Sequence, residues 1–362
     1  MRIAVLGTKG VPGRHGVEVV VDSLLPELAA LGHQLTVYAY SSYACPQDDY
    51  KGGRIRTVRG IPQKNLEMIT HMWSASLETW REPYDVVHIH STDPCLLAWL
   101  PRARNGIVAT SHGQAYMRRK WSAPARGMSL VAERFFMRLP QVVTSVSKPL
   151  AAYYAEKYGR EVKYIPNGIV LREKPDVGFL KEWGLEPEGF LFCSAGRMDR
   201  TKGVHVLLEA YRLMNSRLPL LIAGGGSGSD FHYLESLKRS KPDGVVFTGF
   251  LTGDALYALY AHARVFVFPS EYEAMSMALL EGLSFGTPTV YSSIPENEAV
   301  AEGLGYSFPV SDARALARQL EEVLNRYPAA VERGRKAREF IQTNHSWGTI
   351  ARRYHEIYVG LC

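Results

Sequence analysis

The chain has 362 residues, which at about 150 residues per domain corresponds to two domains rather than one. Its composition, with 46% hydrophobic, 22% charged and 11% aromatic residues, is typical of a soluble globular protein and excludes disordered, collagen-like and low-complexity classes. The 42 Lys and Arg residues outnumber the 36 Asp and Glu residues, and the basic excess lies in residues 1–168, which carry 21 basic against 13 acidic residues.

Membrane insertion, export and disulfide bonding are not indicated by the sequence. The longest apolar stretches, such as Leu218–Gly226, are shorter than the roughly 18 residues that span a bilayer. The N-terminus reaches Lys9 and Arg14 after too few apolar residues for a signal peptide. The four cysteines are far apart and form no C-x-x-C pair, which argues against a zinc site or a disulfide framework. We therefore expect a cytoplasmic protein.

The first half of the chain alternates short apolar runs with helical patterns. A strand at Ile3–Leu6 leads through a glycine-rich loop into a helix from Val17 to Leu31, which Gly32 ends. Further strands are predicted at Leu35–Tyr40, Asp85–His90, Ile107–Ser111, Val142–Ser145 and Val162–Ile165. Pro166-Asn167-Gly168 interrupts this rhythm, and the charged stretch Leu171–Glu188 follows. We place the domain boundary after residue 168.

The second half repeats the alternation. Strands are predicted at Phe190–Ala195, Leu220–Gly224, Val245–Thr248, Val265–Phe268, Thr289–Tyr291 and Tyr306–Phe308. Helical patterns at Ala313–Arg326 and Ala329–Gln342 end this series, and residues 344–362 predict a last helix that packs back on the first domain. Strands that alternate with helices form parallel sheets covered on both faces. The fold class is therefore α/β, with two doubly wound, Rossmann-like domains, residues 1–168 and 169–343, facing a central cleft.

Two loops have the composition of anion-binding sites. Glycines at positions 7, 10, 13 and 16 follow the first strand and precede a helix, where backbone N–H groups and the helix dipole attract an anion. Their spacing does not fit G-x-G-x-x-G, and a tight turn with positive φ explains them equally well. Residues 196–203 place Arg197, Arg200 and Lys202 at the start of a helix, an arrangement suited to a diphosphate. The P-loop order of residues is absent, and a solvated basic loop is the alternative.

Two glutamates, Glu273 and Glu281, form an E-x7-E pair just after a predicted strand. We expect the helix to start near Met275, with Glu273 in the loop before it and Glu281 two turns in. Carboxylates in these places accept hydrogen bonds from sugar hydroxyls, and the amides of residues 275–277 are available to a phosphate. The spacing also arises by chance, since acidic residues are favoured near helix starts.

A histidine, His112, ends the strand Ile107–Ser111, where doubly wound domains place groups that contact ligands. A lone histidine is more often structural, and we assign no role to His88 and His90, which share one face of a strand. The sequence contains no D-x-D or H-E-x-x-H motif. A metal-centred mechanism is therefore disfavoured.

Five segments, in this order along the chain, resemble the retaining GT-B glycosyltransferases of the glycogen-synthase-like family 4. They are Gly7–Pro12, Ser111–Gly113, Tyr164–Gly168, Gly196–Gly203, and Glu273–Glu281 followed by Gly286-Thr287-Pro288. The first two, together with Arg118–Trp121, further resemble a bacterial branch of rhamnosyl- and related transferases that build surface polysaccharides. The sequence departs from the family in two places: Gly16-Val17 replaces Gly-Gly, and Ala274-Met275-Ser276 replaces Gly-Phe-Gly. These departures leave the donor sugar open.

The resemblance implies a retaining hexosyltransferase that takes its sugar from a nucleotide-diphosphate sugar and needs neither a metal nor a cofactor. Arg197 and Lys202 would bind the diphosphate and stabilise its charge as it leaves. Glu281 would hold the ribose, Glu273 would contact the sugar, and His112 would lie near the anomeric carbon. The other positions that the resemblance assigns to donor binding are Gly13, Gly16, Asn167, Gly249, Phe250, Met275 and Ser276.

The acceptor implied by the resemblance is a saccharide or lipid-linked saccharide of cell-surface polysaccharide synthesis. A basic cluster would then attract anionic lipid at the inner face of the membrane; it comprises Arg118, Arg119, Lys120, Arg126, Arg134 and Arg138. A solvated basic face is the alternative, and no nucleic-acid motif is present. A GT-B enzyme with a small soluble acceptor, a sugar-nucleotide epimerase and a non-catalytic sugar-nucleotide-binding scaffold remain open, whereas the missing G-x-G-x-x-G disfavours an NAD-dependent oxidoreductase.

Overall fold

The computed structural model covers the whole chain and describes all residues except 14–15, 44–48, 64–65, 115–122, 215–216 and 227–228. The described chain forms two compact units. Met1–Gly168 together with His345–Cys362 make the first unit, and Ile169–Asn344 make the second. The chain therefore crosses from one unit to the other after Gly168 and returns after Asn344.

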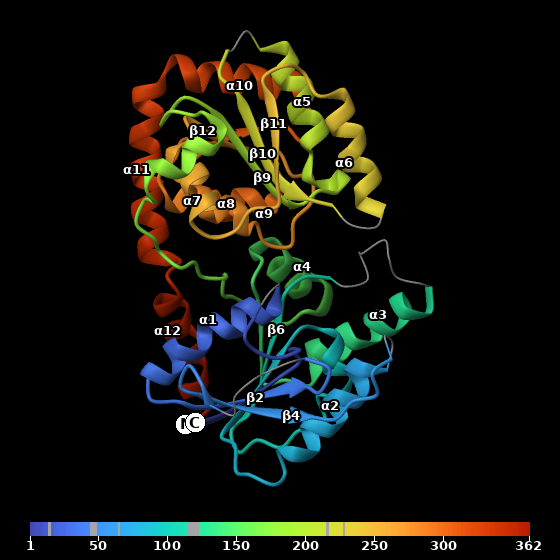
Figure 1. Ribbon diagram of the computed structural model, residues 1–362. Helices are drawn as coiled ribbons and strands as arrows, with labels where there is room; N and C mark the ends of the chain where they lie inside the picture. Colours follow the sequence, from blue (N-terminus) through green and yellow to red (C-terminus); the bar gives the residue numbers. More distant parts are fainter. Residues whose placement is uncertain (14–15, 44–48, 64–65, 115–122, 215–216, 227–228) are drawn as a thin grey trace. The chain divides into compact units, whose positions relative to one another are not determined.

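An eight-stranded sheet forms the centre of the first unit, in the order β3-β4-β2-β1-β5-β6-β7-β8 (Figure 1). Its strands are β1 (Arg2–Leu6), β2 (Gln34–Tyr40), β3 (Asp49–Tyr50), β4 (Gly53–Val58), β5 (Val86–His90), β6 (Gly106–Ser111), β7 (Val142–Ser145) and β8 (Lys163–Tyr164). All neighbouring strands are parallel except the β3–β4 pair. Every strand predicted for this unit is present, whereas β3 and β4 were not predicted. In β4 only Gly53, Ile55 and Val58 are buried, so its apolar signal is weak.

Helices cover both faces of this sheet. The core on one face is built by α1 (Val17–Ala30) and α12 (Trp347–Val359), whose buried side chains share one cluster. The core on the other face is built by α2 (Glu67–Glu78), the short helix η1 (Asp93–Leu97), α3 (Ala123–Arg138) and α4 (Lys148–Tyr158). The last helix of the chain is thus an integral part of the first unit.

A six-stranded parallel sheet forms the centre of the second unit, in the order β11-β10-β9-β12-β13-β14. Its strands are β9 (Leu191–Arg197), β10 (Leu220–Gly225), β11 (Val245–Gly249), β12 (Val265–Phe268), β13 (Thr289–Ser292) and β14 (Tyr306–Phe308). The four inner strands β10, β9, β12 and β13 are buried along most of their length because helices cover both faces, whereas the edge strands β11 and β14 are partly exposed. The α/β prediction of two doubly wound domains is confirmed.

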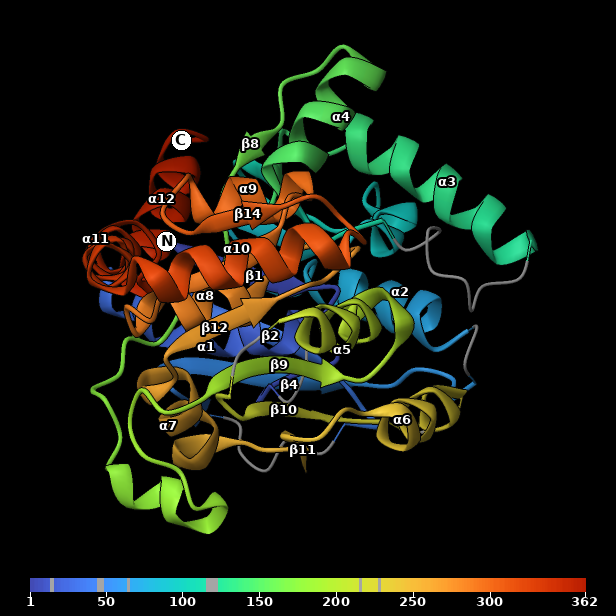
Figure 2. The same ribbon diagram turned by 90° about the horizontal axis from the view of Figure 1, so that it is seen from above.

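The helices of the second unit divide between the two faces of the sheet. One face is covered by α5 (Val204–Leu213), α6 (Ser229–Ser240) and α10 (Ala313–Asn325), with α10 alongside α5 (Figure 2). The other face is covered by η3 (Val177–Trp183), α7 (Gly253–His262), α8 (Met277–Ser284), α9 (Pro295–Ala301) and α11 (Tyr327–Asn344). A single short turn, η4 (Arg200–Lys202), lies between β9 and α5. It carries part of the predicted diphosphate loop.

Candidate active site

The predicted diphosphate loop of the second unit begins inside β9, because the strand extends to Arg197 and includes two residues that we expected in the loop. Asp199 caps the following turn by accepting a hydrogen bond from the backbone N–H of Thr201 (2.9 Å). The Asp199 carboxylate also accepts hydrogen bonds from the Arg197 guanidinium at 2.8 and 3.0 Å. These contacts lower the pKa of Asp199, although its partial burial opposes the shift. Asp199, which the sequence pattern did not single out, orients Arg197.

Lys202 and Glu273, 71 positions apart in sequence, form an ion pair. Lys202 Nζ lies 2.7 Å from Glu273 Oε1, and both side chains are largely buried. The loop after β12 and the turn before α5 are joined at the backbone as well, since the N–H of Glu271 donates to the carbonyl of Thr201 at 2.7 Å. Lys202 and Glu273, which both lie at the carboxyl ends of strands in the same sheet, are held together by these contacts.

Glycine is required where these two segments cross. Gly203 has φ +66°, and a Cβ atom there would lie 1.9 Å from the carbonyl oxygen of Pro269. No side chain fits without moving the backbone that leads to Glu273. The Gly196–Gly203 motif thus owes its last glycine to a close backbone approach.

The helix with the second glutamate starts later than expected. It begins at Met277, not near Met275, so Glu281 lies about one turn into the helix rather than two. Burial raises the pKa of Glu281 to about 6, while the neighbouring Tyr260 hydroxyl and the charge of Arg172 partly offset that effect. Tyr260 is fully buried, and its hydroxyl lies beside the Glu281 carboxyl. Glu281 is thus a partly exposed residue whose carboxyl has a pKa of about 6.

Ser276 occupies the N-cap position of this helix, but its side chain does not cap it. The hydroxyl is buried and donates to Asn297 Oδ1, and Asn297 Nδ2 donates to the carbonyl and hydroxyl of Ser292, both at 3.0 Å. Only the backbone of Ser276 is therefore available for the donor contact that we assigned to it. The sequence offered no signal for Asn297, which lies 21 residues further along the chain.

Two other predicted positions lie together at the end of one strand in the same unit. Gly249 ends β11 with φ +79°, and Phe250 follows with its side chain 64% exposed. Gly225 ends β10, and a Cβ atom there would lie 3.3 Å from that of Phe250. An exposed aromatic ring at a strand end next to glycine backbone is a surface on which a planar base can stack.

His112 belongs to the first unit, directly after β6. Its Nε2 lies 3.0 Å from Nδ1 of His90, which ends the neighbouring strand β5. Burial lowers the pKa of His112 to about 4 and that of His90 well below its usual value, so both rings are neutral at pH 7. One ring therefore donates its N–H to the other. The sequence placed His90 on a strand face without a role, and the structure brings it to His112.

The histidine pair continues into a buried polar network. The His88 ring lies against that of His90, with ring centroids 4.1 Å apart. His88 Nδ1 lies 2.8 Å from the hydroxyl of Tyr358 in α12, and His88 Nε2 lies 2.7 Å from Thr110 Oγ1. Burial lowers the pKa of His88 to about 3. The C-terminal helix thus supports the strand that carries His90.

The remaining predicted positions also lie in the first unit. Gly13 passes so close to Glu18 that a Cβ atom would lie 2.4 Å from its backbone, and Gly16 is the N-cap of α1 with φ +57°. Asn167 is buried beside His345, whose Nδ1 lies 3.4 Å from its carbonyl oxygen. These three positions belong to the first unit, whereas Arg197, Lys202, Glu273 and Glu281 belong to the second. Arg118, Arg119 and Lys120 lie outside the described residues.

Metal ligands do not gather at any of these places. Within the described ranges there is no group of three or more His, Cys, Asp or Glu side chains that could hold a metal ion. The cations that face the carboxyl edge of the second sheet are instead side chains, Arg197 and Lys202.

Comparison with known proteins assigns both halves of the chain. The family "Glycosyltransferase Family 4" matches residues 14–173, and "Glycosyl transferases group 1" matches residues 179–340. The chain belongs to the family 4 glycosyltransferases, which have the GT-B fold. It is a retaining glycosyltransferase that transfers a sugar from a nucleotide sugar.

Individual relatives are distant. The chain is 29% identical to the glycogen synthase of Mycobacterium tuberculosis, over 78% of this chain and 69% of that protein. It is 27% identical to the GDP-mannose-dependent alpha-(1-6)-phosphatidylinositol monomannoside mannosyltransferase of Mycolicibacterium smegmatis, over 96% of each. Among solved structures, sucrose-phosphate synthase from Thermosynechococcus elongatus has the same fold, with a TM-score of 0.83 and 23% identity over 99% of this chain and 98% of that one.

Proposed function

We propose that this glycosyltransferase moves a hexosyl group to a saccharide or lipid-linked saccharide acceptor in the synthesis of a cell-surface polysaccharide. The second unit binds the nucleotide-sugar donor, and the first unit binds the acceptor. The M. smegmatis relative, whose name specifies both a nucleotide-sugar donor and a lipid acceptor, supports an acceptor of the lipid-linked type. The enzyme acts in the cytoplasm, at the inner face of the membrane.

The ion pair between Lys202 and Glu273 carries the proposal. The Lys202 ammonium lies 2.7 Å from the Glu273 carboxylate, and both side chains are largely buried. When a diphosphate binds beside them, this one cation interacts with two anions, the carboxylate and the diphosphate. Lys202 then shares its N–H donors between the diphosphate and Glu273, and Glu273 is held beside the sugar of the donor. Arg197, 60% exposed and oriented by Asp199, adds a planar donor pair suited to a phosphate. Together they stabilise the charge that the departing diphosphate develops.

The other groups contact the rest of the donor. Glu281 accepts hydrogen bonds from the ribose hydroxyls, and the Gly249-Phe250 backbone and ring face the base. The N-terminus of α8, with the backbone of Met275 and Ser276 before it, presents its dipole to a phosphate. His112 contacts the transferred sugar, and the loop with Gly13 and Gly16 and the segment with Asn167 complete the donor site.

The donor assignment is tested by calorimetry of the purified protein, without added metal, against UDP, TDP, GDP, ADP and NAD. We expect one nucleoside diphosphate to bind and Lys202→Ala to abolish that binding, because the diphosphate loses a cation and Glu273 is left unpaired. Turnover of the matching sugar nucleotide should fall about 10²–10³-fold, as when one electrostatic donor is removed from an active site.

Lys238→Ala is the matched control, since Lys238 is also a lysine of the second unit in an ion pair, with Glu235 at 3.0 Å, but lies on the exposed face of α6. It should bind nucleotide normally. Near-normal turnover of Lys202→Ala would refute the assignment. Binding of nucleotide without any transfer or hydrolysis would favour a non-catalytic scaffold, and binding of NAD alone would favour an oxidoreductase.

A further inference from the structure

Helix α2 of the first unit carries apolar side chains on the face turned to solvent. Its buried face holds Met72 and Ala75, which pack against the sheet. Trp73 and Leu77 lie on the opposite face, each 46% exposed, and Trp80, just past the helix, is 56% exposed. The spacing of four and then three residues places these side chains on one line of the helix surface. An amphipathic surface helix normally shows polar side chains there.

A third exposed tryptophan extends this line. Trp99 follows η1 and is 58% exposed, and its ring meets that of Trp73 edge to face with centroids 6.4 Å apart. We call Trp73, Leu77, Trp80 and Trp99 the tryptophan face. Large side chains gathered in this way on a soluble protein mark a surface that another partner covers.

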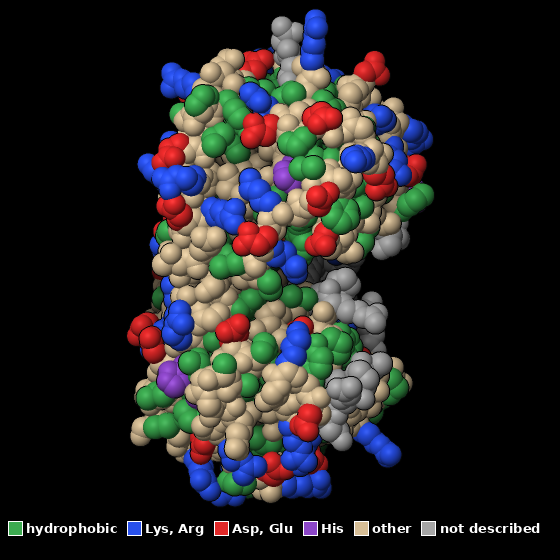
Figure 3. All heavy atoms as spheres, turned by 60° about the vertical axis from the view of Figure 1, so that its left-hand side comes forward, with side chains coloured by type: hydrophobic (Ala, Val, Ile, Leu, Met, Phe, Trp, Pro, Cys, Tyr) green, Lys and Arg blue, Asp and Glu red, His purple; other side chains and the backbone are tan. Residues whose placement is uncertain are grey.

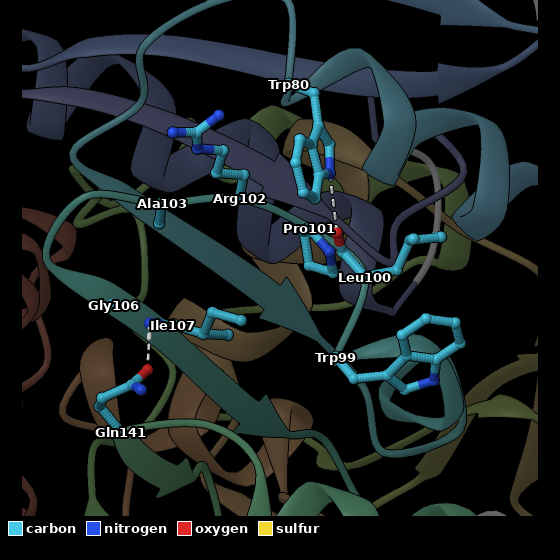
Figure 4. A pocket seen from close by; sticks show the side chains of 9 residues that line it. All are labelled: Trp80, Trp99, Leu100, Pro101, Arg102, Ala103, Gly106, Ile107 and Gln141. Carbon is cyan, nitrogen blue, oxygen red and sulfur yellow. Dashed lines mark hydrogen bonds between the residues drawn. The ribbon is translucent and has the colours of Figure 1, made fainter.

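A hollow of about 520 Å³ beside the tryptophan face is not built for a polyhydroxylated ligand (Figure 4). The indole N–H of Trp80 already donates to the carbonyl of Leu100 at 2.9 Å. The side-chain acceptor that lines the hollow, Gln141 Oε1, already accepts the N–H of Ile107 at 2.6 Å. The Arg102 guanidinium lies over the Trp80 ring, 5.3 Å from its centroid, and covers one face of that ring. The hollow thus offers rings and a cation rather than free hydrogen-bond acceptors.

The surroundings of the tryptophan face are basic. The described part of residues 101–148 contains six Lys and Arg residues and a single acid, Glu133. Glu133 is buried, accepting hydrogen bonds from Lys157 at 2.6 Å and from the Tyr158 hydroxyl at 2.7 Å, so it does not oppose this charge at the surface. Arg102 and Arg104 are exposed beside the hollow. By contrast, acidic and basic side chains are interspersed on the face of the molecule shown in Figure 3.

Helix α3 continues the same surface. The short helix η1 contacts both α2 and α3, so the three lie in one layer over the sheet. The described side chains that α3 exposes are Arg126, Leu130, Val131, Arg134 and Arg138, without an acid among them. In α2 the partly exposed acid Glu78 is paired with Arg56 and Arg81. Exposed tryptophans, aliphatic side chains and arginines are the composition of a surface that enters a lipid headgroup region.

We propose that the layer formed by α2, η1 and α3 docks on an anionic lipid bilayer, with the tryptophan face inserted among the headgroups and the arginines bound to anionic lipid. The arginines draw the protein to the surface over a distance set by salt, and the tryptophan face adds an apolar contribution that salt does not screen. No helix in the described part of the chain is long and apolar enough to span a membrane, so the contact is one of surface docking. The inference deepens the proposed action on a lipid-linked acceptor, but the contact is measurable without donor or acceptor.

The test is co-sedimentation of the full-length protein with vesicles of phosphatidylcholine, alone or mixed with phosphatidylglycerol, at low and high salt. We expect binding to the mixed vesicles, part of which persists at high salt. The double variant Trp73→Ser, Trp99→Ser should lower the partition coefficient about tenfold or more, because each large apolar side chain removed from water contributes roughly that factor. Its remaining binding should disappear at high salt.

The matched control is the double variant Phe179→Ser, Leu213→Ser, which removes two exposed apolar side chains from the second unit and should bind like the unaltered protein. Trp99→Ser alone, with a smaller expected loss, serves if the double variant unfolds. Lipids brominated on their acyl chains should quench the tryptophan fluorescence of the unaltered protein, and the double variant should lose most of that quenching. Nucleotide binding should be the same in all variants, which separates this test from that of the donor site.

Three results would overturn the proposal. Equal vesicle binding by the double variant and the control would show that the arginines act alone. The unaltered protein could instead fail to bind vesicles and form concentration-dependent dimers in light scattering. If the same substitutions abolish those dimers, the tryptophan face is an interface with a second copy of the chain. Calorimetric binding of a neutral oligosaccharide, lost in Trp99→Ser, would assign it to a saccharide.

Discussion

Single side chains in this enzyme owe their chemistry to burial and to one close partner. His112 is neutral because protein surrounds it, and His90 fixes the ring through a 3.0 Å contact between their nitrogens. A neutral histidine acts as a hydrogen-bond partner rather than as a positive charge. Burial acts in the opposite direction on Glu281, because it raises the pKa of this carboxyl to about 6. The carboxyl must be ionised to accept hydrogen bonds from both ribose hydroxyls.

The raised pKa of Glu281 predicts a pH dependence of donor binding. An ionised carboxylate accepts hydrogen bonds from both ribose hydroxyls, whereas the protonated group also needs an acceptor for its own proton. Nucleotide affinity should therefore fall as the pH drops through about 6, by about tenfold for each pH unit below the pKa. Folding stability should change in the other direction, because the folded protein binds this proton more tightly than the unfolded chain.

Calorimetry of the nucleoside diphosphate between pH 5 and pH 7.5 measures the effect. Glu281→Gln should bind weakly and lose this pH dependence, whereas Glu235→Gln, which alters an exposed carboxylate of α6, should behave like the unaltered protein. A Glu281→Gln variant with an unchanged pH profile would place the titrating group elsewhere.

Elements meet at the candidate site through backbone contacts as much as through side chains. The turn η4 and the loop after β12 touch at Gly203 and Pro269, and the N–H of Glu271 donates to the carbonyl of Thr201. This contact sets the distance between Lys202 on one segment and Glu273 on the other. An ion pair 71 positions apart in sequence thus depends on a glycine that carries no charge.

Alanine substitution of two glycines with nearly the same backbone conformation separates this contact from backbone strain. Gly203 and Gly253 have φ of +66° and +65°, but a Cβ atom would meet the Pro269 carbonyl at Gly203 and nothing within 4 Å at Gly253. Gly253→Ala should cost about 1 kcal/mol in the free energy of unfolding, as expected for a left-handed alanine. Gly203→Ala should cost about 1–3 kcal/mol more, from overpacking, and should lose nucleotide binding.

Urea unfolding and calorimetry of both variants give the two quantities. Equal losses of stability in the two variants would mean that the loop after β12 moves away from the added methyl group at no cost in the free energy of unfolding. Full nucleotide affinity in Gly203→Ala would mean that the distance from Lys202 to Glu273 does not govern the site.

The whole molecule is a chain of two units in which sequence order and spatial order differ. Helix α12 is last in the sequence but completes the core of the first unit, where Trp347, Ile350, Tyr354 and Tyr358 pack with side chains of α1. Gly168 at the crossing lies so close to Trp347 that a Cβ atom would be 2.6 Å from the indole ring. The first unit is therefore incomplete until the last 18 residues have been made.

Deletion of residues 345–362 should unfold the first unit and leave the second unit folded. Four large buried side chains at about 1.5–3 kcal/mol each approach or exceed the net stability of an ordinary domain, about 5–15 kcal/mol. Limited proteolysis should then cut within residues 1–168 and leave a resistant fragment near 169–344. Removal of Cys362 alone, beyond the end of α12, should change little. A deletion variant that resists proteolysis throughout would show that α12 is dispensable.

The sequence alone determined the α/β class, the strands of both halves and the candidate cations and carboxylates, because apolar periodicity and residue chemistry are local properties. It did not reveal β4, in which only Gly53, Ile55 and Val58 are buried, nor the start of α8 at Met277. It also gave no sign of Asn297 behind Ser276 or of His90 beside His112. Only the tertiary structure decided these pairings, together with the ion pair of Lys202 and Glu273 and the tryptophan face. Contacts between distant segments depend on how strands are ordered and helices are packed, which no local pattern records.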